Sequence, residues 1–224
     1  MVMGVMAENW TGISSTNPTA AKITLVSSDI ETSTVSVQLE GYALSTVQTP
    51  KGPAQIVSVG NSTPILKAGA PDLPKLTASL IIPDLALMDA KVVSSNYIDY
   101  EGVVIAPSKG EFSRQLNPSS VPFTWGAEYQ SNRFFPESLV NTREPFIMRD
   151  FRGQTLVINP FQYNPITRVL RVYSNITIQF YKINNNGVNP YNRTNPQVAV
   201  NREFQDVYNR FFLNFPQSDY TPLN

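Results

Sequence analysis

Hydrophobic residues at every second position indicate that this chain is rich in β-strands. Val35, Val37 and Leu39 alternate with polar residues over residues 34–40. A longer alternation covers residues 170–180, with a bend expected near Ser174. Successive side chains of a strand point to opposite faces, so a period of two predicts strands with one buried face.

Shorter segments of the same character extend along the chain. They occupy residues 21–26, 55–59, 76–82, 91–97, 146–149 and 154–158, and residues 163–167 form the expected turn between two strands. The 18 prolines and 11 glycines separate these short strands. The pattern predicts an all-β fold, an antiparallel β-sandwich or jelly-roll-like domain, with a barrel as the related alternative. We expect this domain to span residues 20–183.

The pattern changes after the sandwich. Residues 184–200 are rich in Asn and contain two prolines, which predicts a linker. A short helix is expected over residues 201–215, with an apolar face made by Phe204, Val207, Tyr208, Phe211 and Phe212. These residues follow the i, i+3, i+4, i+7, i+8 spacing of one helical face. The helix is expected to pack on the sandwich or on whatever follows it in the chain.

The two ends of the chain resemble processing regions. Residues 1–19 begin with a short apolar run followed by small residues, which indicates a signal remnant or a disordered N-terminus. Residues 216–224 are interpreted as a junction with a following segment.

Residues 106–122, APSKGEFSRQLNPSSVP, form a long loop with few strand signals. The loop contains three prolines, and Arg114 lies near its middle. Prolines favour extended geometry at their flanks, whereas Gly110 allows a bend. Long loops in compact domains are often functional. Two interpretations are open: a solvated surface loop, or a loop that another protein recognises.

Composition excludes several classes of function. The 224 residues include 17 basic and 17 acidic side chains, without a basic block, which argues against nucleic acid as a partner. No apolar run reaches the length of a membrane-spanning helix. Cysteine and histidine are absent, so Cys–His and Ser–His–Asp catalysis and zinc sites built on these residues are excluded. The acids are scattered and no phosphate or calcium loop occurs. We therefore expect no enzyme, no cofactor and no metal.

An ordered series of short motifs resembles the N-terminal prodomain of the gingipains, secreted bacterial cysteine proteases that cut after Arg or Lys. The resemblance runs from about Asn61 to Pro222, and the first 60 residues match only loosely. The motifs are GAPDLP (69–74), APSKG (106–110), Ser113-Arg114, Asn117-Pro118, Pro122-Phe123, FFP (134–136), PFIMRD (145–150), RGQ (152–154), QYNP (162–165), LRVY (170–173) and YTP (220–222).

The resemblance implies an all-β prodomain that assists folding of a catalytic domain and keeps it latent. It implies that Arg114 enters the S1 pocket, which receives the side chain before the cut bond, of an Arg-specific protease. Lys109, Phe112, Ser113 and Gln115 are the candidates for flanking contacts. The partner is then the catalytic domain of the same or a related cysteine protease, in a secreted or extracytoplasmic setting, with no nucleic acid and no membrane insertion.

The processing junction implied by the resemblance lies at Asp219 and Tyr220. Asp219 departs from the arginine that self-cleavage by an Arg-specific protease requires. Processing there is then altered, performed by another enzyme, or placed elsewhere.

A different class of function remains open from the residues alone. Trp10 and Trp125 could stack on sugar rings, as in a secreted carbohydrate-binding or adhesive sandwich. Aromatic side chains in a sandwich more often belong to the core.

Overall fold

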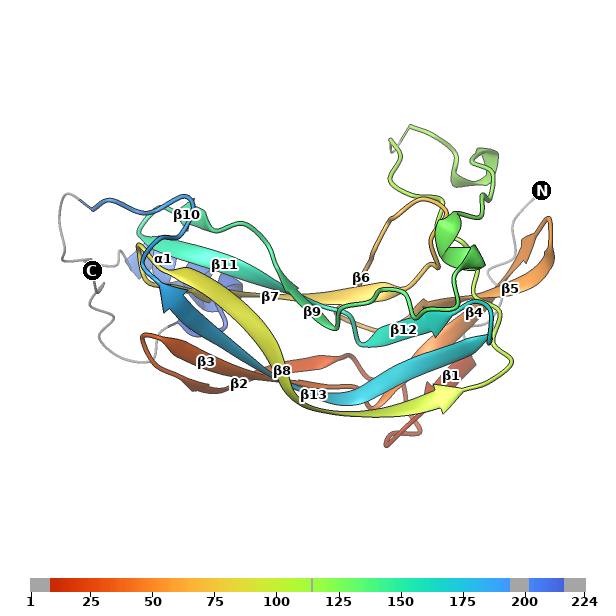
Figure 1. The fold of residues 1–224 in the computed structure, drawn as a ribbon, viewed down its shortest axis with the longest axis horizontal. Helices are drawn as coiled ribbons and strands as arrows, with labels where there is room; N and C mark the ends of the chain where they lie inside the picture. Colours follow the sequence, from red (N-terminus) through yellow and green to blue (C-terminus); the bar gives the residue numbers. More distant parts are fainter. Residues whose placement is uncertain (1–8, 114, 194–201, 216–224) are drawn as a thin grey trace.

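The computed structural model describes residues 9–113, 115–193 and 202–215, and these form two stacked β-layers with one short α-helix (Figure 1). Every strand pairing is antiparallel. The predicted all-β sandwich with a C-terminal helix is therefore confirmed.

Three sheets build the layers. The first has the order β1 (Asn9–Gly12), β4 (Gly41–Thr49), β5 (Gly52–Ser58). The second has the order β10 (Phe146–Met148), β11 (Phe151–Ile158), β7 (Pro74–Ile81), β6 (Thr63–Pro64), with β9 (Val140–Thr142) also paired to β11. The third has the order β12 (Phe161–Asn164), β13 (Val169–Asn184), β3 (Thr32–Gln38), β2 (Lys22–Ser28), with β8 (Leu87–Tyr100) paired to β13.

The alternating strands supply the core as the sequence predicts. Ile176 and Ile178 on β13 lie opposite Val37 and Val35 on β3, and all four side chains are fully buried. They pack with buried residues of β7 and β11 from the other layer. The bend expected near Ser174 is present as a register shift between Tyr173 and Asn175.

Several strands escaped the sequence pattern. Strands β4, β6, β9 and β12 were not predicted, and Tyr163 and Asn164 of the predicted turn at residues 163–167 belong to β12. Strand β1 lies inside residues 1–19, for which a disordered terminus was one expectation. That expectation is wrong for Asn9–Gly12, because these residues pair with β4 in register. The Trp10 indole N–H also donates to the Ser15 carbonyl at 3.0 Å. Residues 1–8 lie outside the described part.

The predicted linker is a strap held against the sandwich over its described residues 184–193. Arg152 is completely buried and donates to four backbone carbonyls, those of Pro83, Ala86, Val188 and Asn189. Arg193 forms a bidentate ion pair with the buried carboxylate of Asp84. Two buried guanidinium groups therefore join the strap to the turn before β8. The strap is thus more firmly attached than the predicted linker.

Helix α1 (Arg202–Phe211) packs on β7 and β11 with only part of its predicted apolar face. Tyr208 is buried, as is Phe212, which directly follows the helix. The Tyr208 and Phe151 rings pack edge-on, with their centres 4.9 Å apart. Val207 and Phe211 stay 41% and 44% exposed. After the helix, the Asn214 side chain bonds both backbone groups of Ile81 and so continues the ladder of β7.

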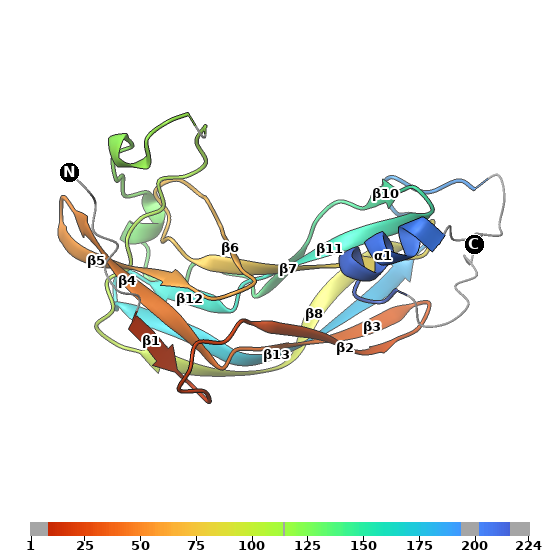
Figure 2. The ribbon, with the colours of Figure 1, turned by 180° about the vertical axis from the view of Figure 1, so that it is seen from behind.

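The molecule is elongated, and its two special regions lie at opposite ends. The loop that follows β8 rises from one end, beside the β4–β5 hairpin, whereas α1 covers the other end (Figures 1 and 2). No helix in the described ranges has the length and apolar character needed to cross a membrane.

Candidate functional site

The root of the loop, residues 105–110, is fixed to the sandwich by backbone pairing. The Asp72 N–H donates to the Ala106 carbonyl at 2.9 Å, and the Ser108 N–H donates to the Ala70 carbonyl at 2.8 Å. Ala106 is fully buried and Ser108 is 2% exposed. The chain therefore leaves the core as an extended segment, as the prolines predict for the loop's flank.

Gly110 is the point at which the loop turns away from the surface. Its φ of +79° is a conformation that favours glycine. A Cβ at this position would lie 2.8 Å from the Cβ of Ala68, which is too close for normal contact. The Gly110 N–H donates to the Ser108 hydroxyl at 3.2 Å. Both the turn and the close approach require glycine here.

The described residues of the tip, 111–113 and 115–120, are mostly exposed, and the tip contains a turn. The Leu116 N–H donates to the Ser113 carbonyl at 2.9 Å, the i to i+3 bond of a turn. The Asn117 carboxamide oxygen accepts from the Ser119 N–H at 3.0 Å and caps the short 3₁₀ helix η1 (Pro118–Ser120). Extended backbone, expected at the flanks of the prolines, is found in the root and again at Asn117 and Val121 on either side of η1.

Lys109 connects the two sides of the tip. Its ammonium donates to the Pro118 carbonyl at 2.7 Å. The same nitrogen lies 4.5 Å from the centre of the Phe123 ring, within the range of a cation–π contact. The Lys109 side chain thus contacts the loop itself in this structure, and its predicted contact with a partner stays a prediction.

A second segment supports the root from outside. The Gly126 N–H donates to the Gly69 carbonyl at 2.9 Å. The Tyr129 hydroxyl, from the 3₁₀ helix η2 (Ala127–Gln130), donates to the Ile105 carbonyl at 2.8 Å. Burial raises the pKa of the Tyr129 phenol, so the hydroxyl stays a donor at any physiological pH.

An ion pair joins this second segment to the loop between β6 and β7. The Lys67 ammonium contacts the Glu128 carboxylate. The hydrogen bond from Lys67 is the main cause that lowers the pKa of Glu128 below its ordinary value. The root is thus supported by a polar network that the sequence did not indicate, because its partners are mostly backbone carbonyls.

The predicted site residues are only partly described. Lys109 is half-buried, Phe112 is partly exposed, and Ser113 and Gln115 are exposed on the tip. Arg114 lies outside the described residues, as do Asp219 and Tyr220. The structure thus places the neighbours of Arg114 on one projecting tip (Figure 1).

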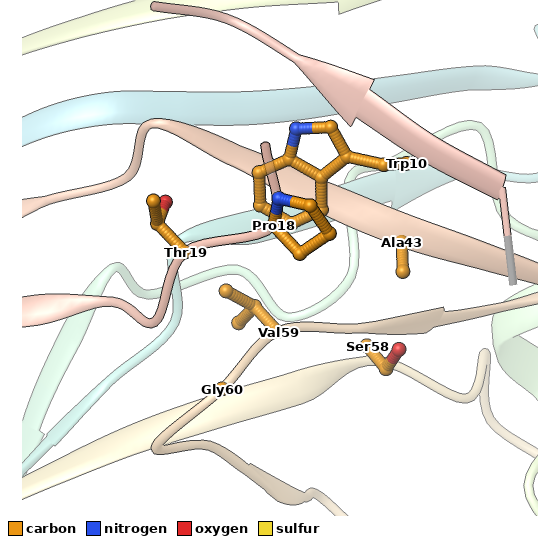
Figure 3. A pocket seen from close by; sticks show the side chains of 7 residues that line it. All are labelled: Trp10, Pro18, Thr19, Ala43, Ser58, Val59 and Gly60. Atoms are coloured by element: carbon orange, nitrogen blue, oxygen red, sulfur yellow. The ribbon is translucent and has the colours of Figure 1, made fainter. Parts of the chain in front are cut away.

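The tryptophans considered for sugar binding are already engaged. Trp10 lines a hollow of about 320 Å³ with Pro18, Thr19, Ala43, Ser58, Val59 and Gly60 (Figure 3). Its ring packs over Gly41, where a Cβ would approach within 2.3 Å. The Lys51 ammonium covers the Trp125 ring at 4.3 Å. These contacts do not favour stacking on a sugar.

The part of the chain that the structure describes holds no group of three or more His, Cys, Asp or Glu side chains able to bind a metal ion.

Comparison with known proteins gives a consistent set of relatives. The family model described as Propeptide_C25 matches residues 14–220. Gingipain R1 of Porphyromonas gingivalis is 37% identical over 189 residues, which are 84% of this chain and 19% of that protein. Gingipain R2 of the same species is 35% identical over 202 residues, which are 90% of this chain and 27% of that protein. The chain thus spans about a quarter or less of these relatives.

Two solved structures share the fold. A chain from the complex of P. gingivalis RgpB pro- and mature domains superposes with a TM-score of 0.78 at 35% identity, covering 86% of this chain and 95% of the other. A chain from a structural study of zymogenic latency of gingipain K superposes with a TM-score of 0.65 at 25% identity, covering 78% of this chain and 98% of the other.

Proposed function

Because the chain belongs to the Propeptide_C25 family, we propose that it is the prodomain of a secreted Arg-specific cysteine protease, which it helps to fold and keeps latent. It is a propeptide domain rather than an enzyme. The observation that carries the proposal is the match, over most of the chain, to a prodomain found in complex with its mature domain. The greater similarity to gingipains R1 and R2 than to Lys-gingipain supports an Arg-specific partner.

The inhibitory element in this proposal is the 106–122 loop, with Arg114 entering the S1 pocket of the catalytic domain. A guanidinium can pair with a pocket carboxylate through two charge-assisted hydrogen bonds, which lysine cannot do. The bonded root supports the proposal, because a loop ordered before docking loses little entropy on binding. The exposed tip supports it as well, because the residues on either side of Arg114 are accessible to a partner.

Two further assignments complete the proposal. The domain acts outside the bacterial cytoplasm, together with the catalytic domain that it escorts. The junction with the mature protease lies at Asp219–Tyr220, where the aspartate disfavours self-cleavage by an Arg-specific enzyme.

The test is inhibition of a mature Arg-specific gingipain by the 224-residue chain and by its Arg114→Ala variant. Truncating one partner of a buried charge pair costs roughly 2–5 kcal/mol, so the inhibition constant should rise about 30-fold or more. Arg133→Ala is the matched control, because Arg133 is 77% exposed and lies outside the loop. Its inhibition constant should stay within about twofold of the parent. An Arg114→Ala inhibitor as strong as the parent would refute the S1 role.

A further inference from the structure

A loop that offers arginine to an Arg-specific protease is chemically a substrate. Hydrolysis of the bond between residues 114 and 115 would consume one water and leave a new carboxylate on residue 114 and a new ammonium on residue 115. Inhibition lasts only if that bond is cut slowly. The question, which rests on the proposed function, is which residues of this chain provide the resistance.

The tip has no support from the sandwich in the hydrogen bonds found for its described residues. The bonds made by Ser113, Leu116 and Asn117 all stay within the loop. Residues 115–120 are exposed throughout. The shape of the tip therefore depends on contacts within the loop and on the segments that flank the tip on either side.

Lys109 makes the contact that closes the tip. It lies at the end of the fixed root, and its ammonium reaches the carbonyl of Pro118, nine residues further on, at 2.7 Å. The Phe123 ring lies beneath the ammonium at 4.5 Å. Because a charged donor bonds a neutral backbone carbonyl, this exposed bond is stronger than a comparable bond between neutral groups.

We propose that Lys109 is a positioning residue that braces the tip across residues 110–117 and thereby makes the loop an inhibitor rather than a substrate. Two effects follow from the brace. The turned tip resists the alignment with a nucleophile that rapid hydrolysis requires, and a small misplacement costs much rate. If the bond is cut, the brace still links the chain on both sides of the cut, so the fragments stay together on the enzyme.

The first arm of the test uses trypsin, which also cuts after arginine and needs no assumption about the natural partner. The free 224-residue chain and its Lys109→Met variant are digested briefly, and mass spectrometry follows only the cut after residue 114. Methionine keeps the apolar stem but removes the donor and the charge. We expect the cut to accelerate about tenfold or more, the equivalent of one lost charge-assisted bond.

Two further variants isolate the brace. Lys51→Met removes another lysine that covers an aromatic ring, Trp125, but makes no contact with the tip that we observe, and should leave the rate unchanged. Lys109→Arg keeps a charged donor and should stay near the parent rate. If Lys109→Met does not fold, Asn117→Ala loosens the tip from its other side, at the cap of η1, and should accelerate the same cut.

The second arm uses a mature Arg-specific gingipain and follows inhibition over time. The Lys109→Met chain should inhibit at first and then lose inhibition as the cut after residue 114 accumulates, whereas the parent persists. Equal trypsin rates for the parent, Lys109→Met and Asn117→Ala would overturn the brace. If trypsin cut Lys109→Met faster than the parent while Arg114→Ala still inhibited fully, the brace would be supported and the S1 role of Arg114 would be rejected.

Discussion

The two ends of the sandwich are stabilised by different forces. At the helix end, α1 buries aromatic rings against β7 and β11, and two buried arginines tie the strap to the sheet. At the loop end, an exposed tip is held by hydrogen bonds within the loop and by a lysine over an aromatic ring. Apolar burial is the larger contributor to folding free energy. Changes at the loop tip should therefore alter recognition while the fold persists, and changes at the helix end should do the reverse.

The largest expected effect comes from Phe212→Ala at the helix end. Phe212 is 1% exposed and contacts the Phe146 and Phe151 rings, so its truncation should cost about 3–5 kcal/mol of unfolding free energy. Phe211→Ala is the comparison on the adjacent residue, which is 44% exposed but meets the Phe146 ring edge-on, and it should cost about 1–2 kcal/mol. Urea unfolding measures both. If Phe212→Ala and Phe211→Ala lost the same unfolding free energy, burial would not explain the contribution of Phe212.

An intermediate effect is expected from Gly110→Ala at the loop root. Gly110 and Gly102 have similar positive φ values, +79° and +72°, so alanine should strain each backbone by about 1–2 kcal/mol. Only Gly110 has a close neighbour, Ala68, whereas nothing lies within 4 Å of a Cβ at Gly102. Gly110→Ala should therefore lose about 1 kcal/mol more than Gly102→Ala in urea unfolding. If Gly110→Ala and Gly102→Ala lost the same unfolding free energy, the close approach of Ala68 to Gly110 would be unimportant for stability.

The smallest effect is expected from the ion pair beside the root. The pKa of Glu128 is lowered from its ordinary value of 4.5, chiefly by the hydrogen bond from Lys67. A lowered folded-state pKa adds stability that is present above the ordinary pKa and is lost as pH falls through the folded-state value. The gain is under about 1 kcal/mol, since Lys67 is mostly exposed.

Melting temperatures at pH 7 and pH 3 measure this contribution. The decrease in melting temperature from pH 7 to pH 3 should be slightly larger for the parent than for Glu128→Gln, because the variant has no charge at position 128 to lose. Glu137→Gln serves as the control, because Glu137 and its partner Arg133 are both about three-quarters exposed. An identical drop in the parent and Glu128→Gln would mean that the pair adds nothing.

Strict alternation was the signal that identified strands correctly, and its absence explains the strands that were missed. Strand β13 has one face in the core along residues 170–180, so the period of two is visible in the sequence. Strand β4 begins with three buried residues in succession, Gly41, Tyr42 and Ala43, which breaks that period. A helix was expected over residues 201–215, and α1 covers Arg202–Phe211. Of its predicted apolar face, Tyr208 and Phe212 are buried, Phe204 packs against them, and Val207 and Phe211 are largely exposed.

The location of the loop was predictable, but its internal support was not. Prolines and missing strand signals delimit residues 106–122 in any reading of the sequence. The bonds that shape the loop end on backbone carbonyls, those of Pro118 and Ile105 among them, which carry no side-chain signature. The same holds for Arg152, since sequence rules place arginine at the surface and give no sign of four carbonyls gathered around it.

The buried arginines of the strap have a consequence for the lifetime of the domain. A protease that recognises arginine must draw the side chain into its own pocket. Arg152 is completely buried, and the Arg193 side chain is 5% exposed, so neither can be drawn out while the sandwich is intact. Both become ordinary cut sites once the chain unfolds. If the partner is the Arg-specific protease proposed above, unfolding would thus add two cut sites to those that exposed arginines such as Arg133 already offer. Unfolded copies of the domain would then be degraded faster than folded ones.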